Sequence, residues 1–226
     1  LYAGDVFQTL CRARGLALPN PEVIEILPEG AETARHDSPP LRQIVQGMLE
    51  YSTNLTAEAI GLAASRADDP AASAAAMAEW LRGQGIGGDF AFHDHSGLSP
   101  LNRVDARMLA ALMAGPGQRR NLRGLMKPIP LRDARGKRKD SDIAIEAKTG
   151  TLNFVSNLAG YAQRPGRREL AFAILTGDEP RRAASEGQEL PEGVTGWTKR
   201  SKALQQALIE GWLGEFAAQP PVASAQ

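Results

Sequence analysis

Two short polar segments hold the residue types that acyl-transfer chemistry uses. Residues 52–54 (STN) supply hydroxyls and a carboxamide, and residues 148–151 (KTGT) supply an ammonium group and two further hydroxyls. A serine hydroxyl attacks a carbonyl only when a base takes its proton, and a lysine held neutral can be that base. Each segment also has a plain structural interpretation: the first can cap a helix, and the second can end a strand at a glycine bulge.

The elements around the two segments must bring them together, because they lie far apart in the sequence. Apolar residues recur at helical spacing over 41–49 and again over 55–63, so Ser52–Asn54 falls at a break between two helices. Residues 143–147 alternate as a half-buried strand does, and Lys148 ends this strand. Nothing local joins the two segments. Only a shared site would bring them together, and we predict that the Ser52 hydroxyl and the Lys148 ammonium group lie within or near hydrogen-bond reach.

The remaining periodicity predicts an α+β (or mixed α/β) fold. Further helices are expected over 71–83, over 104–113 with Asn102 as the N-cap, and over 204–216. Apolar runs over 154–161 and 170–176 flank a turn sequence and predict an antiparallel hairpin. One domain is expected over 1–217, with a flexible tail over 218–226.

In the order of the two segments and in the sequence around them, the chain resembles the class C low-molecular-weight penicillin-binding proteins. These are the D-alanyl-D-alanine carboxypeptidase/endopeptidase family. Penicillin-binding proteins carry Ser-x-x-Lys, then a motif of the Ser-Asp-Asn type, then Lys-Thr-Gly. The similar stretches are 38–41 (SPPL), 52–59 (STNLTAEA), 94–99 (DHSGLS) and 148–161 (KTGTLNFVSNLAGY). The resemblance extends from about Tyr2 to Trp212. His95 stands where family members usually carry glycine.

The resemblance implies a β-lactamase/transpeptidase-like fold, an antiparallel sheet flanked by helices, with its N-terminal part missing. It also implies a serine-type peptidase that cleaves peptidoglycan stem peptides through an acyl-enzyme. No serine of this sequence has a lysine three residues later. We therefore expect the nucleophilic Ser-x-x-Lys motif upstream and interpret the chain as the C-terminal portion of the peptidase domain.

Site roles follow from the same resemblance. The residues implied as catalytic are Ser52, Asn54 and Lys148, and those implied as substrate-binding are Thr149, Gly150 and Thr151. Ser52 would relay a proton toward the leaving D-alanine amine, and the Asn54 amide would hold the nucleophile's lysine and the substrate. Lys148 would attract the substrate carboxylate. The threonine hydroxyls would bind that carboxylate, and the Thr151 N–H would be an oxyanion donor.

The partners implied are peptidoglycan stem peptides and β-lactams, in the periplasm, without a metal or an organic cofactor. Composition fits this interpretation: Lys+Arg and Asp+Glu balance at 26 each, so no basic excess points to nucleic acid. No apolar run approaches the roughly 18 residues that a transmembrane helix needs. His93 and His95 invite a metal interpretation, but a loop that supports the next helix is the better one. The basic run 132–139 is interpreted as a solvated loop.

Two other functions stay open from the sequence. A non-catalytic peptidoglycan-binding or interaction protein would keep the groove without a nucleophile. A β-lactamase-like hydrolase fits less well, because the sequence that flanks the two motifs resembles that of the peptidases. An upstream Ser-x-x-Lys motif would favour the enzyme over the binding protein.

Overall fold

The structure, a computed structural model, describes residues 1–26, 28–32 and 34–216. Contacts divide the chain into two compact units, Leu1–Ser38 and a second unit that begins at Pro39. The flexible tail predicted over 218–226 lies outside the described residues. Within the described ranges, no helix is both long enough and apolar enough to cross a bilayer.

The first unit is a single helix with a folded-back segment. Helix α1 (Tyr2–Arg12) ends before Gly15, whose φ of +81° lets the chain reverse. The Gln8 side chain then donates hydrogen bonds to the carbonyls of Leu18 and Pro19, at 3.1 and 2.9 Å. None of the α1 residues, all of which are described, is buried. This unit therefore has little core of its own.

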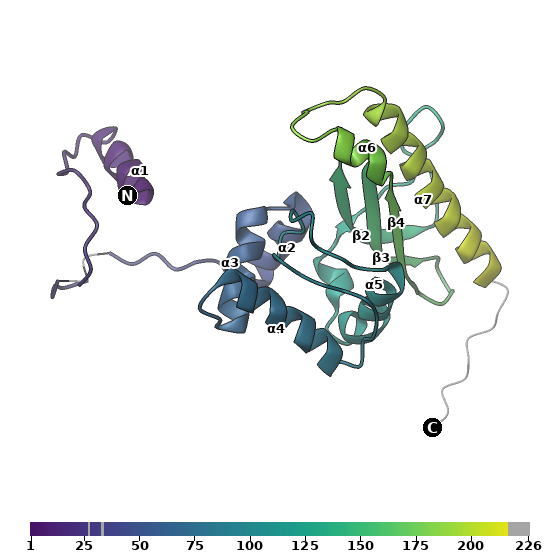
Figure 1. The fold of residues 1–226 in the computed structure, drawn as a ribbon, viewed down its shortest axis with the longest axis horizontal. Helices are drawn as coiled ribbons and strands as arrows, with labels where there is room; N and C mark the ends of the chain where they lie inside the picture. Colours follow the sequence, from purple (N-terminus) through teal and green to yellow (C-terminus); the bar gives the residue numbers. More distant parts are fainter. Residues whose placement is uncertain (27, 33, 217–226) are drawn as a thin grey trace. The chain divides into compact units, whose positions relative to one another are not determined.

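The second unit is built on an antiparallel sheet with strand order β1-β2-β3-β4. Figure 1 labels the three long strands of this sheet, β2, β3 and β4. Its strands are β1 (Lys127–Pro128), β2 (Ala144–Leu152), β3 (Val155–Gln163) and β4 (Leu170–Gly177). β2 and β3 meet at a tight turn, where Phe154 has a left-handed φ of 55°. The predicted hairpin of the last two long strands is confirmed.

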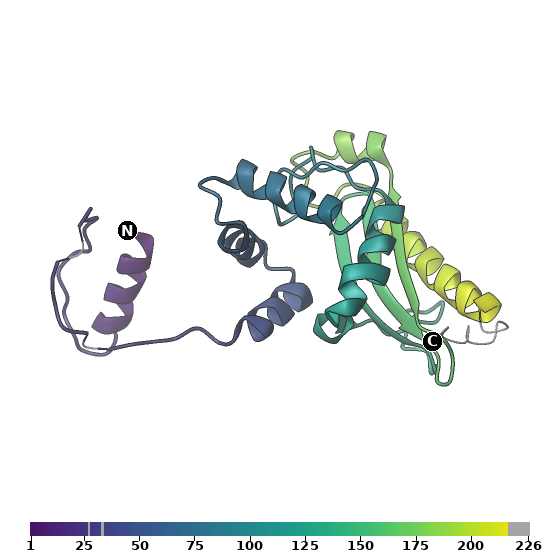
Figure 2. The ribbon, with the colours of Figure 1, turned by 90° about the horizontal axis from the view of Figure 1, so that it is seen from below.

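Helices cover both faces of this sheet (Figures 1 and 2). Helix α7 (Val194–Phe216) lies on one face, where Ile145 and Ala147 of β2 belong to one core with Ile209 and Leu213 of α7. Helix α5 (Ala106–Leu112) and the π-helical turn η1 (Met113–Gly117) lie on the other face, and a short helix, α6 (Glu179–Ala184), follows β4. The α+β prediction is confirmed, and successive β2 side chains point to opposite layers.

Three further helices precede α5. They are α2 (Leu41–Tyr51), α3 (Asn54–Ser65) and α4 (Pro70–Gly83). Only α4 buries side chains, and its Leu81 packs with Met108 in a second small core. The predicted N-cap of the next helix is wrong: Asp105, not Asn102, caps α5 by accepting the Met108 N–H at 2.7 Å. The Asn102 side chain instead bonds the preceding loop, because Asp94 and the His93 N–H lie within reach.

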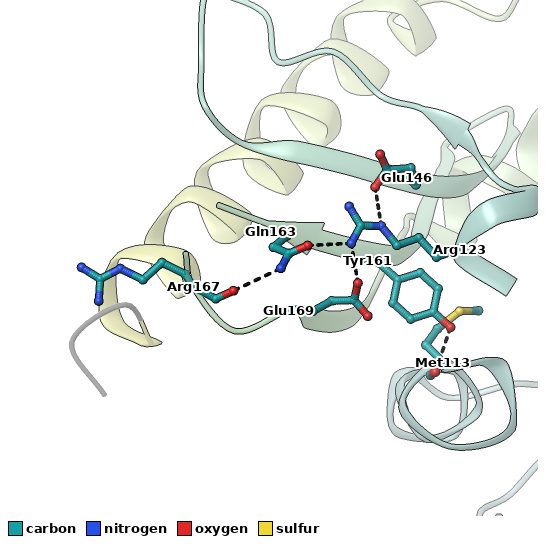
Figure 3. Close-up of polar contacts among 7 residues, drawn as sticks. All are labelled: Met113, Arg123, Glu146, Tyr161, Gln163, Arg167 and Glu169. Carbon is teal, nitrogen blue, oxygen red and sulfur yellow. Dashed lines mark hydrogen bonds and ion pairs between the residues drawn. The ribbon is translucent and has the colours of Figure 1, made fainter. Parts of the chain in front are cut away.

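Arg123, on the short 3₁₀ turn η2 (Leu122–Leu125), ties this turn to the sheet (Figure 3). Its guanidinium donates to the carboxylates of Glu146 and Glu169 at 2.8 and 2.5 Å, and to the Gln163 amide oxygen at 2.7 Å. These partners come from β2, from β3 and from just before β4. A fork-shaped donor with partners on β2, on β3 and just before β4 fixes the η2 turn against the sheet.

Tyr161 anchors the opposite layer in the same region (Figure 3). Its side chain is 0% exposed, and its hydroxyl donates to the Met113 carbonyl at 2.8 Å. Burial, followed by the negative charge of Glu169, raises the pKa of Tyr161 to about 12. The hydroxyl therefore stays protonated and keeps its role as a donor throughout the range in which the protein is handled.

Replacing this hydroxyl tests whether the anchor stabilises the fold. Tyr161→Phe removes one of two donors to the Met113 carbonyl, which also accepts the Gln118 N–H, so we expect a loss of about 0.5–1.5 kcal/mol in the free energy of unfolding. Urea denaturation should show a lower midpoint at an unchanged slope. Tyr51→Phe is the matched control, because Tyr51 is 73% exposed and should unfold as the wild type does. Equal midpoints for the two variants would contradict this account.

Candidate active site

Ser52 lies at the junction of α2 and α3, where the backbone turns sharply. It follows the last residue of α2, and its φ of 56° and ψ of 49° are left-handed, which few residues other than glycine adopt. Thr53 is extended at the N-cap position, and Asn54 is the first residue of α3. This turn leaves the Ser52 side chain exposed at the end of two helices.

Lys148 reaches this junction from the middle of β2. Its ammonium group donates to the Ser52 hydroxyl oxygen at 2.6 Å, across 96 residues of sequence. It also donates to the carbonyl of Thr149 at 2.5 Å. The predicted approach of the two side chains is therefore confirmed. No carboxylate in the described part of the chain pairs with Lys148, so its positive charge is not neutralised locally.

The surroundings of Lys148 lower its pKa. Partial burial makes the larger contribution, because it disfavours the charged form, and the positive charge of Lys127 adds to it. Lys127 lies on β1 opposite Ala147 and donates to the Glu50 carbonyl at 3.3 Å, near the end of α2. Two lysines therefore face the same junction, which favours an anionic ligand there.

The pleat of β2 separates the other predicted residues into two layers. Ile145 and Ala147 face α7, so alternation directs Thr149 and Thr151 to that side, opposite Lys148. Thr149 is half-buried and Thr151 is exposed, and Thr151 lines a hollow beside α7. Gly150 and Asn54 are also exposed. Contacts of these four residues with a substrate stay a prediction.

One edge of β2 is open beside Lys148. β1 pairs only with Glu146 and Ala147, so residues 148–152 have no strand partner on that side among the described residues. An unpaired edge presents N–H and C=O groups at the spacing of a strand, which an extended peptide can match. An extended peptide paired with this edge would run past the Ser52–Lys148 contact.

Glu58, which the motif-based interpretation missed, holds the helix that carries Asn54. Its carboxylate accepts the backbone N–H groups of His95 and Ser96, at 3.2 and 2.9 Å. Burial would raise the pKa of Glu58, but hydrogen bonds from Ser96 and His95 lower it overall. Glu58 lies one turn after Asn54, on the same face of α3. The four-residue spacing between Asn54 and Glu58 can be read from the sequence. It does not predict the role of Glu58, because the N–H groups that bind its carboxylate come from a loop far along the chain.

His95 has a packing role. Its Nε2 lies 2.7 Å from the Ser73 hydroxyl of α4, and its ring lies against Gly61 of α3, where an added Cβ would come within 2.2 Å of a ring carbon. The described residues contain no cluster of three or more His, Cys, Asp or Glu side chains that could hold a metal. His95 and Ser96, in the loop between α4 and α5, therefore contact both α3 and α4. That this loop supports the next helix stays a prediction.

The sequence model of the D-Ala-D-Ala carboxypeptidase 3 (S13) family matches residues 1–200 of this chain. The chain belongs to this family. Among curated proteins, it is 32% identical over 193 residues to carboxypeptidase Rv3627c of Mycobacterium tuberculosis, covering 77% of this chain and 41% of that protein. The chain therefore spans less than half of the length of this relative.

Solved structures support the fold. Penicillin binding protein 4 of Haemophilus influenzae, solved in complex with a β-lactam, matches with a TM-score of 0.64 at 22% identity, over 92% of this chain and 51% of that one. The predatory endopeptidase Bd0816 of Bdellovibrio bacteriovorus matches with a TM-score of 0.55 at 16% identity, over 98% and 58%. This S13 chain therefore has the fold of the penicillin-binding peptidases, as predicted.

The two-lysine arrangement gives a direct test of the site's electrostatics. Lys127→Met removes a positive charge but keeps most of the stem, so the pKa of Lys148 should rise toward that of an ordinary lysine. NMR titration of the Lys148 side chain measures this directly. In the wild type, Lys148 should lose its proton at a lower pH than exposed lysines do. Lys137→Met, in the exposed loop, is the control. An unchanged Lys148 titration in Lys127→Met would contradict the assigned cause.

Proposed function

We propose that this chain forms the C-terminal portion of a serine-type D-Ala-D-Ala carboxypeptidase/endopeptidase that acts on peptidoglycan stem peptides in the periplasm. One observation carries the proposal: the fold brings the Lys148 ammonium group onto the Ser52 hydroxyl across 96 residues. Membership of the S13 family supports it, as do the relative named as a carboxypeptidase and the neighbour named as an endopeptidase.

The reaction proposed is acyl transfer to a serine. The nucleophile would belong to a Ser-x-x-Lys motif outside this sequence, since no serine here has a lysine three residues on. Its oxygen attacks the carbonyl of the penultimate D-alanine while a base takes its proton. The carbon–nitrogen bond then breaks, the terminal residue leaves as an amine that receives a proton, and water hydrolyses the ester. Acylation by penicillin follows the same first step.

The residues of this chain would serve both steps. Ser52 lies within one hydrogen bond of Lys148 and would pass a proton toward the leaving amine. Lys148, with its lowered pKa and no carboxylate partner among the described residues, would attract the substrate's terminal carboxylate. Asn54, the first residue of α3, would hold the substrate's peptide group.

The open edge of β2 would position the peptide. The hydroxyls of Thr149 and Thr151 are proposed to bind the terminal carboxylate, and Gly150 lets the backbone approach closely. The Thr151 N–H would be one of the two oxyanion donors, a group whose loss typically slows a reaction by about 10²–10³. The other donor would be the N–H of the nucleophile.

Covalent labelling tests this division of the site. A fluorescent penicillin should not label the 226-residue chain, because none of its serines has the lysine partner that acylation needs. The parent protein with the proposed upstream Ser-x-x-Lys segment should be labelled with about one equivalent, stable to heating in detergent. Excess unlabelled penicillin added first should abolish the signal.

The same assay has two outcomes that would contradict the proposal. Stoichiometric, heat-stable labelling of the 226-residue chain would place the nucleophile among its own serines. A parent that is neither labelled nor able to release D-alanine from a D-Ala-D-Ala peptide would favour a non-catalytic binding protein.

A further inference from the structure

The two halves of the candidate site are held in place in different ways. Lys148 lies on β2, where Ile145 and Ala147 are buried in the core that β2 forms with α7. Ser52 and Asn54 lie at the α2–α3 junction, and these two helices, each described over its whole length, bury no side chain. The helical half of the site therefore needs support from contacts outside α2 and α3.

Helix α4 is a well-packed neighbour that can give this support. Its Ala78 and Leu81 belong to the second small core, and its Ser73 is 0% exposed. The Ser73 hydroxyl lies 2.8 Å from the hydroxyl of Ser65, the last residue of α3. This hydrogen bond joins the C-terminal end of α3 to α4. The rest of α3, which leads back to the candidate site, must be held by other contacts.

His95, in the loop between α4 and α5, supplies these contacts. Its Nε2 atom lies 2.7 Å from the same Ser73 hydroxyl of α4. Its ring lies on α3 at Gly61, where an added Cβ would come within 2.2 Å of a ring carbon. Its backbone N–H donates to the Glu58 carboxylate at 3.2 Å, one turn nearer to Asn54. One residue therefore contacts α3 at two positions and α4 at a third.

The close approach of the His95 ring to α3 depends on the glycine at position 61. Glycine in a helix interior destabilises the helix by roughly 0.5–1 kcal/mol relative to alanine, because it loses more conformational freedom on folding. Gly61 lies inside α3, four residues from its end, so α3 carries this cost where the ring packs. An alanine there would favour the helix but exclude the ring. The contact between His95 and Gly61 is therefore what the glycine makes possible.

We propose that His95 is a positioning residue for the reaction proposed above. Its ring, packed on Gly61 and bonded to Ser73, fixes α3 against α4. A fixed α3 in turn keeps the α2–α3 junction at the distance from β2 that the contact with Lys148 requires. The inference rests on the proposed function for the reaction that this positioning serves. The positioning itself can be measured without catalysis.

The first test uses the 226-residue chain and follows the Lys148 ammonium protons by NMR. In the wild type the hydrogen bond to Ser52 slows their exchange with water. His95→Ala should speed this exchange about fivefold, which corresponds to the loss of one ordinary hydrogen bond. His93→Ala is the matched control, because His93 is exposed in the same loop, and it should exchange as the wild type does. An unchanged exchange rate in His95→Ala would overturn the inference.

The second test measures acylation of the parent protein by penicillin, under conditions in which every variant is folded. His95→Ala should lower the acylation rate constant by about 10–100-fold, as a displacement of about 1 Å at a reacting site does. The affinity for penicillin before acylation should change little, because Lys148 stays on the sheet. His95→Gln should recover most of the rate, since its side-chain amide can donate to Ser73 or accept from it. A purely structural role would instead lower the unfolding midpoint and leave the rate constant unchanged, which would contradict the proposal.

Gly61→Ala tests the same contact from the α3 side, and it keeps the inference testable if His95→Ala does not fold. The added methyl group displaces the ring, so this variant should also speed the Lys148 exchange and slow acylation. In a His95→Ala background it should add no further loss, because no ring is left to displace. Wild-type behaviour of Gly61→Ala, or losses that add in the double variant, would overturn the inference and leave the proposed function standing. If penicillin does not acylate the wild-type parent, the proposed function fails, and the exchange rates decide whether His95 positions the junction.

Discussion

The contact between Lys148 and Ser52 is the interaction on which the account of this site depends. It joins a strand in the sheet to the junction of two helices that themselves bury no side chain. The sheet must therefore hold Lys148 in place, and the packing of Ile145 and Ala147 against α7 does so from one face. Glu58 holds the helical side by bonding the loop at His95. Neither partner is positioned by local sequence alone.

The electrostatic surroundings of Lys148 favour a functional role for its contact with Ser52 over a purely structural one. Burial and Lys127 both disfavour the charged form of Lys148, and no described carboxylate compensates. A structural site would gain stability from an acidic neighbour, as Arg123 does from Glu146 and Glu169. This difference between the two cations is consistent with the proposed binding of an anionic ligand by Lys148. Functional sites commonly give up such stability.

The sequence was enough to predict the α+β fold, the β3–β4 hairpin and the meeting of Ser52 with Lys148, because periodicity and motif order carry that information. It did not reveal which face of β2 each threonine occupies, since that depends on where the α7 core lies. The sequence favours Asn102 as a helix cap, but in the structure its side chain forms hydrogen bonds with Asp94 and with the His93 N–H instead. Glu58 was missed because its partners are backbone N–H groups, which no side-chain pattern marks.

The most direct test of the central claim is a double-mutant cycle on Ser52 and Lys148 in the parent protein, with the rate of acylation by penicillin as the readout. If the two side chains act as one unit, Ser52→Ala and Lys148→Met should each slow acylation, and the double variant should be about as slow as the slower single variant. The coupling energy should then be about 1–3 kcal/mol. If the two losses add within about 0.5 kcal/mol, the residues act independently, and the contact has no shared role in catalysis.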